Sequence, residues 1–299
     1  MKVMITGRTG QLVQCLLEKA RATPGLDLQA VGRPEVDLED PGSAARAIGQ
    51  LRPAIVINAA AYTAVDQAED EPQKASRING EAAGEVAAAA LEAGASVIQI
   101  STDYVFDGRA EGEYAPDETT SPLGAYGRSK LLGEELVRAA SPNHAIVRTS
   151  WVYSSYGKNF VKTMMALAES RDEVGVVADQ FGNPSSAHDL ADGLLAMLAR
   201  WATDPKAGLG ETFHLAGTGT TSWFDFAAAT FEQCARLGVP AARVMPIRTA
   251  NWPTRAERPR NSALDSSKFA ATFGYRMPRW RDSLSSVVSR LVELRTAAR

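Results

Sequence analysis

The sequence predicts an α/β protein in which a doubly wound parallel sheet is followed by a smaller, mixed α/β lobe. Through the first half of the 299 residues, short β-branched runs alternate with longer helical stretches, which is typical of βαβ units. Several runs are apolar on successive residues, as expected for strands that are covered on both faces. The length allows two domains, or one large unit with an appendage.

The expected elements of the first half alternate regularly, and their crossovers should be right-handed. The helical stretches are rich in Ala, Leu, Glu and Lys, which are good helix formers. Strands are expected at 2–6, 27–31, 54–58, 96–101 and 145–149. Helices are expected at 11–21, 43–51, 81–93 and 129–140.

After Trp151 the pattern is less regular. A strand-like run at 174–178 and a helix at 187–201 are expected to extend the sheet. A strand at 212–215, a helix at 222–237, an arginine-rich loop at 246–261 and a closing amphipathic helix from about 283 to the end form the smaller lobe. We therefore expect one domain at 1–150, joined by 174–203, and a second at 151–173 and 204–299.

Composition excludes several classes of protein. The chain has 32 Lys and Arg against 35 Asp and Glu, a net charge of −3, which gives no electrostatic reason to expect a nucleic-acid or membrane partner. No apolar run approaches the roughly 18 residues of a membrane span, and the amino terminus is too short for a signal peptide, so we expect a cytoplasmic protein. The two cysteines, Cys15 and Cys234, and three scattered histidines cannot build a disulfide framework or a zinc site.

A glycine turn follows the first expected strand. Gly7 permits a tight strand-to-helix turn, and Gly10 lets the backbone approach a pyrophosphate at the positive end of the next helix. This context favours a Rossmann-like dinucleotide site over an ordinary βα turn. Val13 stands where a third glycine is usual, and it should push the helix outward unless a small residue faces it.

The end of the second expected strand indicates which dinucleotide binds. Sites for NAD usually place an acid there for the ribose 2′-hydroxyl, whereas this chain has Gly32 followed by Arg33. A guanidinium could pair with a 2′-phosphate, which favours NADPH, with NADH also possible. The alternative is that Arg33 is a solvated surface side chain.

Tyr126 and Lys130 stand four residues apart and would share one face of a helix. A nearby positive charge would lower the pKa of the phenol from about 10, so that Tyr126 could supply a proton to a ketone oxygen. Alone, such a pair is more often helix surface. Thr102, however, follows the strand at 96–101, at the sheet end where ligands bind, and its hydroxyl could hold the same oxygen.

Together these motifs resemble the extended short-chain dehydrogenase/reductases, and among them the reductases of dTDP-4-keto sugars. The resemblance covers 2–264 and rests on NAAAYTAVD at 58–66, STDYVF at 101–106, RTSWVY at 148–153, DQFGNP at 179–184 and the proline-rich segment 253–262. It implies an oxidoreductase that uses NADPH to reduce the C4 keto group of dTDP-4-dehydro-L-rhamnose. Alternatives are reduction of another dTDP-4-keto sugar, a sugar-nucleotide epimerase, or a non-catalytic nucleotide-binding regulatory subunit.

The resemblance also implies roles for individual residues, with Thr102, Tyr126 and Lys130 as the catalytic set. Cofactor contacts would come, besides Gly7 and Arg33, from Gly10, Gln11, Leu12, Asp37, Leu38, Ala61, Tyr62, Thr63, Tyr126 and Lys130. Substrate contacts would come from Thr102, Asp103, Trp151, Arg255 and Arg258. Trp151 could equally be a core aromatic between the lobes. In the arginine-rich loop at 246–261, one or two guanidiniums would pair with a diphosphate.

Some members of this family dimerise through a divalent ion held by acidic residues. The corresponding positions here are Gln14 and Cys15 in the first helix, and His188 and Asp189 further along. Magnesium prefers oxygen ligands, which this set supplies poorly. We therefore expect no structural metal, and a monomer or weak homodimer.

Overall fold

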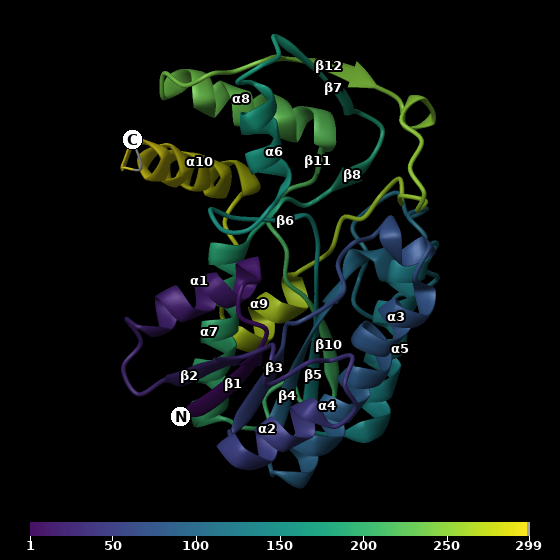
Figure 1. Cartoon of the computed structure of the whole chain (residues 1–299), viewed down its shortest axis with the longest axis vertical. Helices are drawn as coiled ribbons and strands as arrows, with labels where there is room; N and C mark the ends of the chain where they lie inside the picture. Colours follow the sequence, from purple (N-terminus) through teal and green to yellow (C-terminus); the bar gives the residue numbers. More distant parts are fainter. Residues whose placement is uncertain (298–299) are drawn as a thin grey trace.

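A six-stranded parallel sheet forms the centre of the larger lobe in the computed structural model, which describes residues 1–297 (Figure 1). Its strand order is β10-β5-β4-β3-β1-β2. The chain moves outward from β1 in one direction and then from β3 in the other, so the order reverses between these two strands, where α/β folds bind ligands. The strands are β1 (Lys2–Thr6), β2 (Asp27–Val31), β3 (Ile55–Asn58), β4 (Ser96–Thr102), β5 (His144–Thr149) and β10 (Glu211–His214).

Helices cover both faces of this sheet, and each face has its own apolar core. One face packs against α1 (Gln11–Ala20), α7 (Ala187–Thr203) and α9 (Ser267–Phe273). The other packs against α2 (Ser43–Leu51), α4 (Ala82–Glu92) and α5 (Ala125–Ala140). A short helix, α3 (Pro72–Ser76), and a π-helical segment, Arg77–Glu81, lead into α4.

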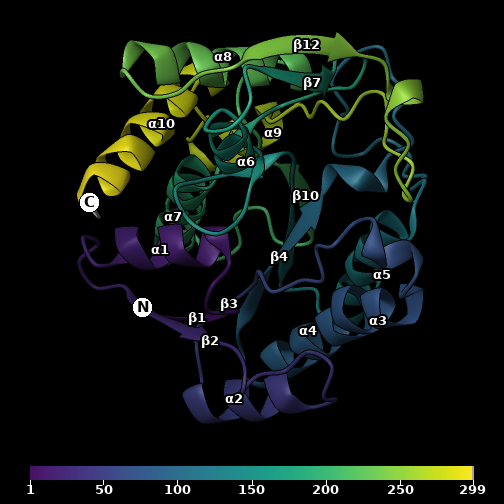
Figure 2. The same cartoon turned by 45° about the horizontal axis from the view of Figure 1, so that its top comes forward.

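The smaller lobe lies beyond the carboxyl ends of the strands (Figure 2). Its core is formed by α6 (Phe160–Leu167), α8 (Trp223–Arg236) and α10 (Trp280–Ala297). Three two-stranded sheets complete it: β7 (Glu173–Val177) with β12 (Arg243–Ile247), β8 (Phe181–Gly182) with β11 (Thr221–Ser222), and β6 (Val152–Tyr153) with β9 (Ser185–Ser186).

Most expected elements form within a few residues of their predicted bounds. Helix α5 begins at Ala125, four residues before its predicted start. The strand at 174–178 does form, as β7, but it pairs with β12 and does not extend the six-stranded sheet. Its buried residues Val174 and Val176 pack with Phe231 of α8, so the apolar face that predicted a strand is satisfied inside the smaller lobe. The closing helix begins at Trp280, and residues 298–299, which were expected to belong to it, lie outside the described residues.

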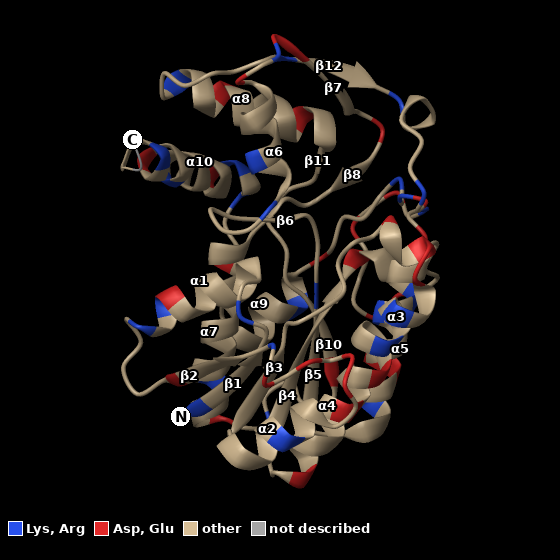
Figure 3. Ribbon diagram, viewed as in Figure 1, with Lys and Arg blue, Asp and Glu red and all other residues tan. Residues whose placement is uncertain are grey.

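Within residues 1–297, none of the helices combines the length and apolar character needed to cross a bilayer. Figure 3 shows that basic and acidic residues are spread over the two lobes and that both signs occur along α5. This mixture of signs is what a nearly balanced composition, with a net charge of −3, would produce.

Candidate active site

The glycine turn between β1 and α1 has the geometry that dinucleotide binding requires. Gly7 has φ +94°, a backbone conformation that residues with a Cβ rarely adopt. Gly10 is the N-cap of α1, where the free amides of the first turn begin. Val13 is buried, and its Cγ2 atom lies 3.6 Å and 3.8 Å from ideal Cβ positions at Gly7 and Gly10. Two glycines therefore face Val13, so Val13 fits between strand and helix without pushing α1 outward.

Arg33 lies at the end of β2 as expected, but carboxylates accompany it. Its guanidinium pairs with Asp37 at 2.9 Å and with Glu39 at 2.6 Å. The loop that follows turns back and brings these carboxylates, four and six positions later, against Arg33, although none stands at position 32 or 33 itself. The Arg33 side chain stays 64% exposed, and Leu38 is buried in the core beneath α2.

The loop after β3, which contains Ala61, Tyr62 and Thr63, is fixed by a residue that sequence reasoning missed. Asn79 lies in the π-helical segment and is buried; its Oδ1 accepts from the amide of Tyr62 at 2.8 Å, and its Nδ2 donates to the Tyr62 carbonyl at 3.0 Å. The same Nδ2 donates to Ser129 of α5 at 2.9 Å. Asn79 thus connects the loop with α5. Single π turns often occur at functional sites, but no sequence pattern predicted this one.

Tyr126 and Lys130 both lie in α5, one turn apart, as predicted. Lys130 is buried and donates from Nζ to the Ile100 carbonyl of β4 at 2.7 Å. Burial lowers the pKa of Lys130 to about 8, while the nearby carboxylate of Glu134 raises it. The ammonium group is therefore held at the sheet end by a neutral carbonyl.

The pKa of Tyr126 does not move in the expected direction. Burial raises it to about 12, hydrogen bonding with Thr102 lowers it, and the charge of Asp103 raises it. The expectation of a phenol pKa lowered by Lys130 was wrong, because removing water from the phenolate outweighs the favourable contacts. Tyr126 consequently keeps its proton at neutral pH, as a proton donor must.

Thr102 and Asp103 stand where β4 ends, beside Tyr126. The Thr102 hydroxyl donates to Oδ1 of Asp103 at 2.8 Å. Asp103 is 2% exposed, and its Oδ2 is buried without a hydrogen-bond partner among the described residues. Burial raises the pKa of Asp103 to about 6, and the nearby hydroxyls of Ser262 and Thr102 partly oppose this shift. The site therefore contains a carboxyl that changes charge near neutral pH.

A buried ion pair, which the sequence did not predict, braces this end of the sheet. Glu134 of α5 accepts from Arg148 of β5 through two bonds of 2.8 Å and 2.7 Å. Ser101 donates to the same carboxylate at 2.6 Å, and Arg138 at 2.9 Å. Ser101 and Arg148 are opposite each other in the β4–β5 register, so both face α5. The pair holds α5 one turn after Lys130.

Trp151 lies between the lobes and is partly exposed. Its Nε1 donates to Ser262 at 3.1 Å, and its ring stacks on Trp223. Ser262 accepts this bond and lies near Asp103, whose pKa it lowers, so it stands between the indole and the end of β4.

The side chain of Gln11, at the start of α1, reaches across to the smaller lobe. Its Oε1 accepts from Ser154 at 2.8 Å and from Asn159 at 3.0 Å, and its Nε2 donates to the Val152 carbonyl at 3.4 Å. The glycine turn and the smaller lobe are therefore held together by one residue, a contact that no sequence pattern indicated.

A cavity of about 820 Å³ lies between the loop 107–113 and the arginine-rich segment, with Phe181 in its wall. Arg258 and Arg260 line it, and Arg258 pairs with Asp66 at 2.7 Å. Arg255 is not among the lining residues; it forms an ion pair with Asp70. The cluster expected from sequence is thus divided, because carboxylates from the segment after β3 engage two of its members.

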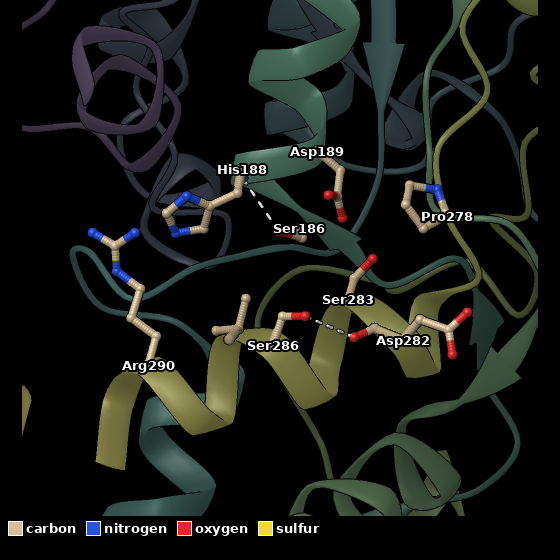
Figure 4. A pocket seen from close by; sticks show the side chains of 9 residues that line it. Ser186, His188, Asp189, Pro278, Asp282, Ser283, Ser286 and Arg290 are labelled. Atoms are coloured by element: carbon tan, nitrogen blue, oxygen red, sulfur yellow. Dashed lines mark hydrogen bonds between the residues drawn. The ribbon is translucent and has the colours of Figure 1, made fainter. Parts of the chain in front are cut away.

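A smaller cavity of about 240 Å³ separates the first turn of α7 from α10 (Figure 4). His188 and Asp189 of α7 face Ser283, Ser286 and Arg290 of α10 across it. Over residues 1–297, no group of three or more His, Cys, Asp or Glu side chains is placed to hold a metal ion.

Comparison with known proteins gives consistent results along the whole chain. A family model described as the RmlD substrate binding domain matches residues 1–293. A dTDP-4-dehydrorhamnose reductase of Sinorhizobium fredii is 43% identical over 288 residues, which are 96% of this chain and 97% of the relative. A crystal structure of a dTDP-4-dehydrorhamnose reductase from Clostridium acetobutylicum superposes with a TM-score of 0.89, at 35% identity, covering 98% of this chain and 100% of that one. The same enzyme from Bacillus anthracis, solved in complex with NADP, gives 0.88 at 35% identity, covering 97% and 99%.

Proposed function

This chain belongs to the RmlD substrate binding domain family of dTDP-4-dehydrorhamnose reductases, and from that membership we infer that it is an NADPH-dependent oxidoreductase. It reduces the C4 keto group of dTDP-4-dehydro-L-rhamnose and so forms dTDP-L-rhamnose. The observation that supports catalysis in this chain is the grouping of Thr102, Tyr126 and Lys130 at the carboxyl end of β4, where Thr102 ends the strand and Lys130 binds the Ile100 carbonyl. A regulatory subunit would have no need of all three.

The glycine turn fits a dinucleotide, since Gly7 and Gly10 leave room for a pyrophosphate against the amides of α1. We propose that Gln11 and Leu12 complete this contact. Ala61, Tyr62 and Thr63 would line the cofactor, with Asp37 and Leu38 at the adenine and Arg33 at the 2′-phosphate. NADPH, when bound, supplies the hydride that C4 of the sugar accepts.

The proton for the ketone oxygen would come from Tyr126. Its phenol is protonated at neutral pH because burial raises the pKa to about 12. The Thr102 hydroxyl would hold the ketone oxygen within reach of the phenol. Lys130, fixed by the Ile100 carbonyl, places a positive charge next to the phenolate that forms, and would also hydrogen-bond the cofactor ribose.

The diphosphate end of the sugar nucleotide would occupy the cavity that Arg258 and Arg260 line, and the sugar would extend from it to Thr102 and Tyr126. We propose that Asp103 and Trp151 contact the sugar and that Arg258 pairs with the diphosphate, at an edge where Arg260 also lies. Arg255 would assist from outside the cavity. In this arrangement the larger lobe holds the cofactor and the smaller lobe closes over the substrate. The division differs from the expected one at two places, because β10 pairs with β5 in the six-stranded sheet and β7 pairs with β12 in the smaller lobe.

The direct test supplies enzymatically prepared dTDP-4-dehydro-L-rhamnose and follows the absorbance of NADPH. We expect oxidation of NADPH in stoichiometric yield with dTDP-L-rhamnose. Binding of NADPH without turnover of this sugar would favour the regulatory interpretation or another dTDP-4-keto sugar, and a panel of such sugars separates these two. We place the reaction in the cytoplasm, with the enzyme a monomer or weak homodimer, which sedimentation velocity over a concentration series can measure.

A further inference from the structure

The indole rings of Trp151 and Trp223 are stacked face to face. Their centroids are 3.5 Å apart and the ring planes differ by 7°. Phe160 packs against Trp223 from α6, with centroids 4.7 Å apart. Among the residues that the structure describes, this is the only pair of tryptophans in ring contact. Trp223 opens α8, so the first turn of a helix in the smaller lobe supports Trp151.

Trp151 needs this support because its backbone is strained. Its φ is +45°, which is a left-handed conformation. Among the described non-glycine residues, only Arg52 also has a positive φ. Such strain persists only where the surroundings fix it. The Trp151 carbonyl accepts from the amide of Ser185 at 3.2 Å, and a Cβ at Gly182 would lie 2.6 Å from the indole. Glycine at 182 is therefore required for the indole to lie where it does.

The same indole is connected to the reacting groups. Trp151 donates from Nε1 to Ser262 at 3.1 Å, and Ser262 lies close enough to Asp103, the neighbour of Thr102, to lower the pKa of that carboxyl. Three constraints thus act on one ring: a stacked partner on one face, a hydrogen bond at one edge, and a strained backbone. The plane of the Trp151 indole is therefore fixed relative to the hydroxyl of Thr102.

We propose that Trp223 is a positioning residue for the reduction, which acts through Trp151. By fixing the plane of Trp151, it aligns the other indole face to receive the C–H face of the keto sugar, so that C4 lies next to Thr102 and Tyr126. Dispersion between a pyranose and an indole depends on close parallel approach, and a ring free to tilt loses it. This inference rests on the proposed function of the site, but its test does not depend on turnover.

The test compares the wild type with Trp223→Leu and Trp223→Phe. Two indoles in contact give an exciton couplet in circular dichroism, and Trp223→Leu should abolish it. We expect Trp223→Leu to weaken binding of dTDP-L-rhamnose in calorimetry, and to raise the KM of the keto sugar, by about tenfold, a size typical of an aromatic pair. The dissociation constant of NADPH should not change. Trp223→Phe keeps an aromatic surface and should restore most of the binding.

Trp201→Phe is the matched control, since Trp201 is a buried tryptophan of α7, 4% exposed, in the core of the other lobe. It should lower thermal stability without changing the couplet or sugar-nucleotide binding. If folded Trp223→Leu binds dTDP-L-rhamnose as tightly as the wild type does, the inference is overturned. If the wild type fails to oxidise NADPH and Trp223→Leu still binds the nucleotide sugar more weakly, the positioning role stands and only the proposed reaction fails.

Discussion

The ammonium group of Lys130 donates to the carbonyl oxygen of Ile100 at 2.7 Å, and this contact ties helix α5 to the end of strand β4. Ile100 precedes Thr102 by two residues, so the bond sets the distance between the helix that carries Tyr126 and the strand that carries Thr102. Burial lowers the pKa of Lys130 to about 8, and Glu134 partly opposes that shift. The charge of Lys130 is therefore lost at a pH that assays can reach.

The charge of Lys130 should control the alkaline side of the pH profile. Lys130 is protonated below pH 8, so kcat/KM for the keto sugar should fall as the pH rises through about 8. Lys130→Arg keeps a positive charge throughout the range, and although its rate will be lower, its alkaline limb should move to higher pH. Initial rates from pH 6 to 10 measure both profiles. An unchanged alkaline limb in the arginine variant would show that another group controls it.

Removing the phenol should abolish proton donation and little else. Tyr126→Phe is expected to lower turnover by about two to four orders of magnitude, the usual contribution of a positioned acid. NADPH binding, followed by fluorescence titration, should change little, because the phenol hydroxyl is one of many contacts. Turnover at the wild-type rate in this variant would disprove the mechanism.

Asp103 should lower the stability of the folded protein at neutral pH. Its pKa is raised from 3.8 to about 6 in the folded state, so the folded protein binds the proton more tightly than the unfolded chain. The destabilisation is absent below about pH 4, grows between pH 4 and 6, and reaches up to about 3 kcal/mol above pH 6.

Asp103→Asn removes this titration. Relative to the wild type it should be more stable at pH 7 and should lose that advantage at pH 4, while activity falls. Urea denaturation of both proteins at the two pH values measures the difference in the free energy of unfolding. A stability difference that is equal at both values would contradict the assignment.

The buried pair of Glu134 and Arg148 should be costly to break. Glu134→Gln leaves the guanidinium of Arg148, whose side chain is 3% exposed, without its carboxylate. The expected loss is about 3–5 kcal/mol in the free energy of unfolding. Glu232→Gln is the matched control, because Glu232 pairs with Arg236 on the exposed surface of α8. It should change stability by less than about 1 kcal/mol, and an equal loss in the two variants would argue against a special role for the buried pair.

Arg33 should determine the preference for NADPH. Arg33→Ala is expected to raise the KM of NADPH by about tenfold or more, the value of a charge-assisted contact, and to leave the KM of NADH nearly unchanged. Arg46→Ala is the control, since Arg46 is also exposed and paired, with Asp40, on the neighbouring helix. Equal effects on both cofactors would exclude a 2′-phosphate contact.

Local patterns in the sequence predicted the elements of the larger lobe and the helix that carries Tyr126 and Lys130. These features depend on β-branched runs, helix formers and glycines within a few residues, so they can be read along the chain. The pairing of β7 with β12 could not be predicted in this way, because a five-residue apolar strand has the same pattern whether it joins the large sheet or a small one. The direction of the Tyr126 pKa depended on burial from several elements, which spacing does not reveal.

The sequence by itself determined the class of fold, the glycine turn and the residues available for chemistry, and with them the family. Only the tertiary structure decided which of those residues meet. Asp37 and Glu39 return to Arg33, Asn79 reaches both the loop of Tyr62 and α5, and Trp223 lies under Trp151 from 72 positions later in the chain. The reason is physical: burial and hydrogen bonding act over a few ångströms in space, whatever the separation of the residues in sequence.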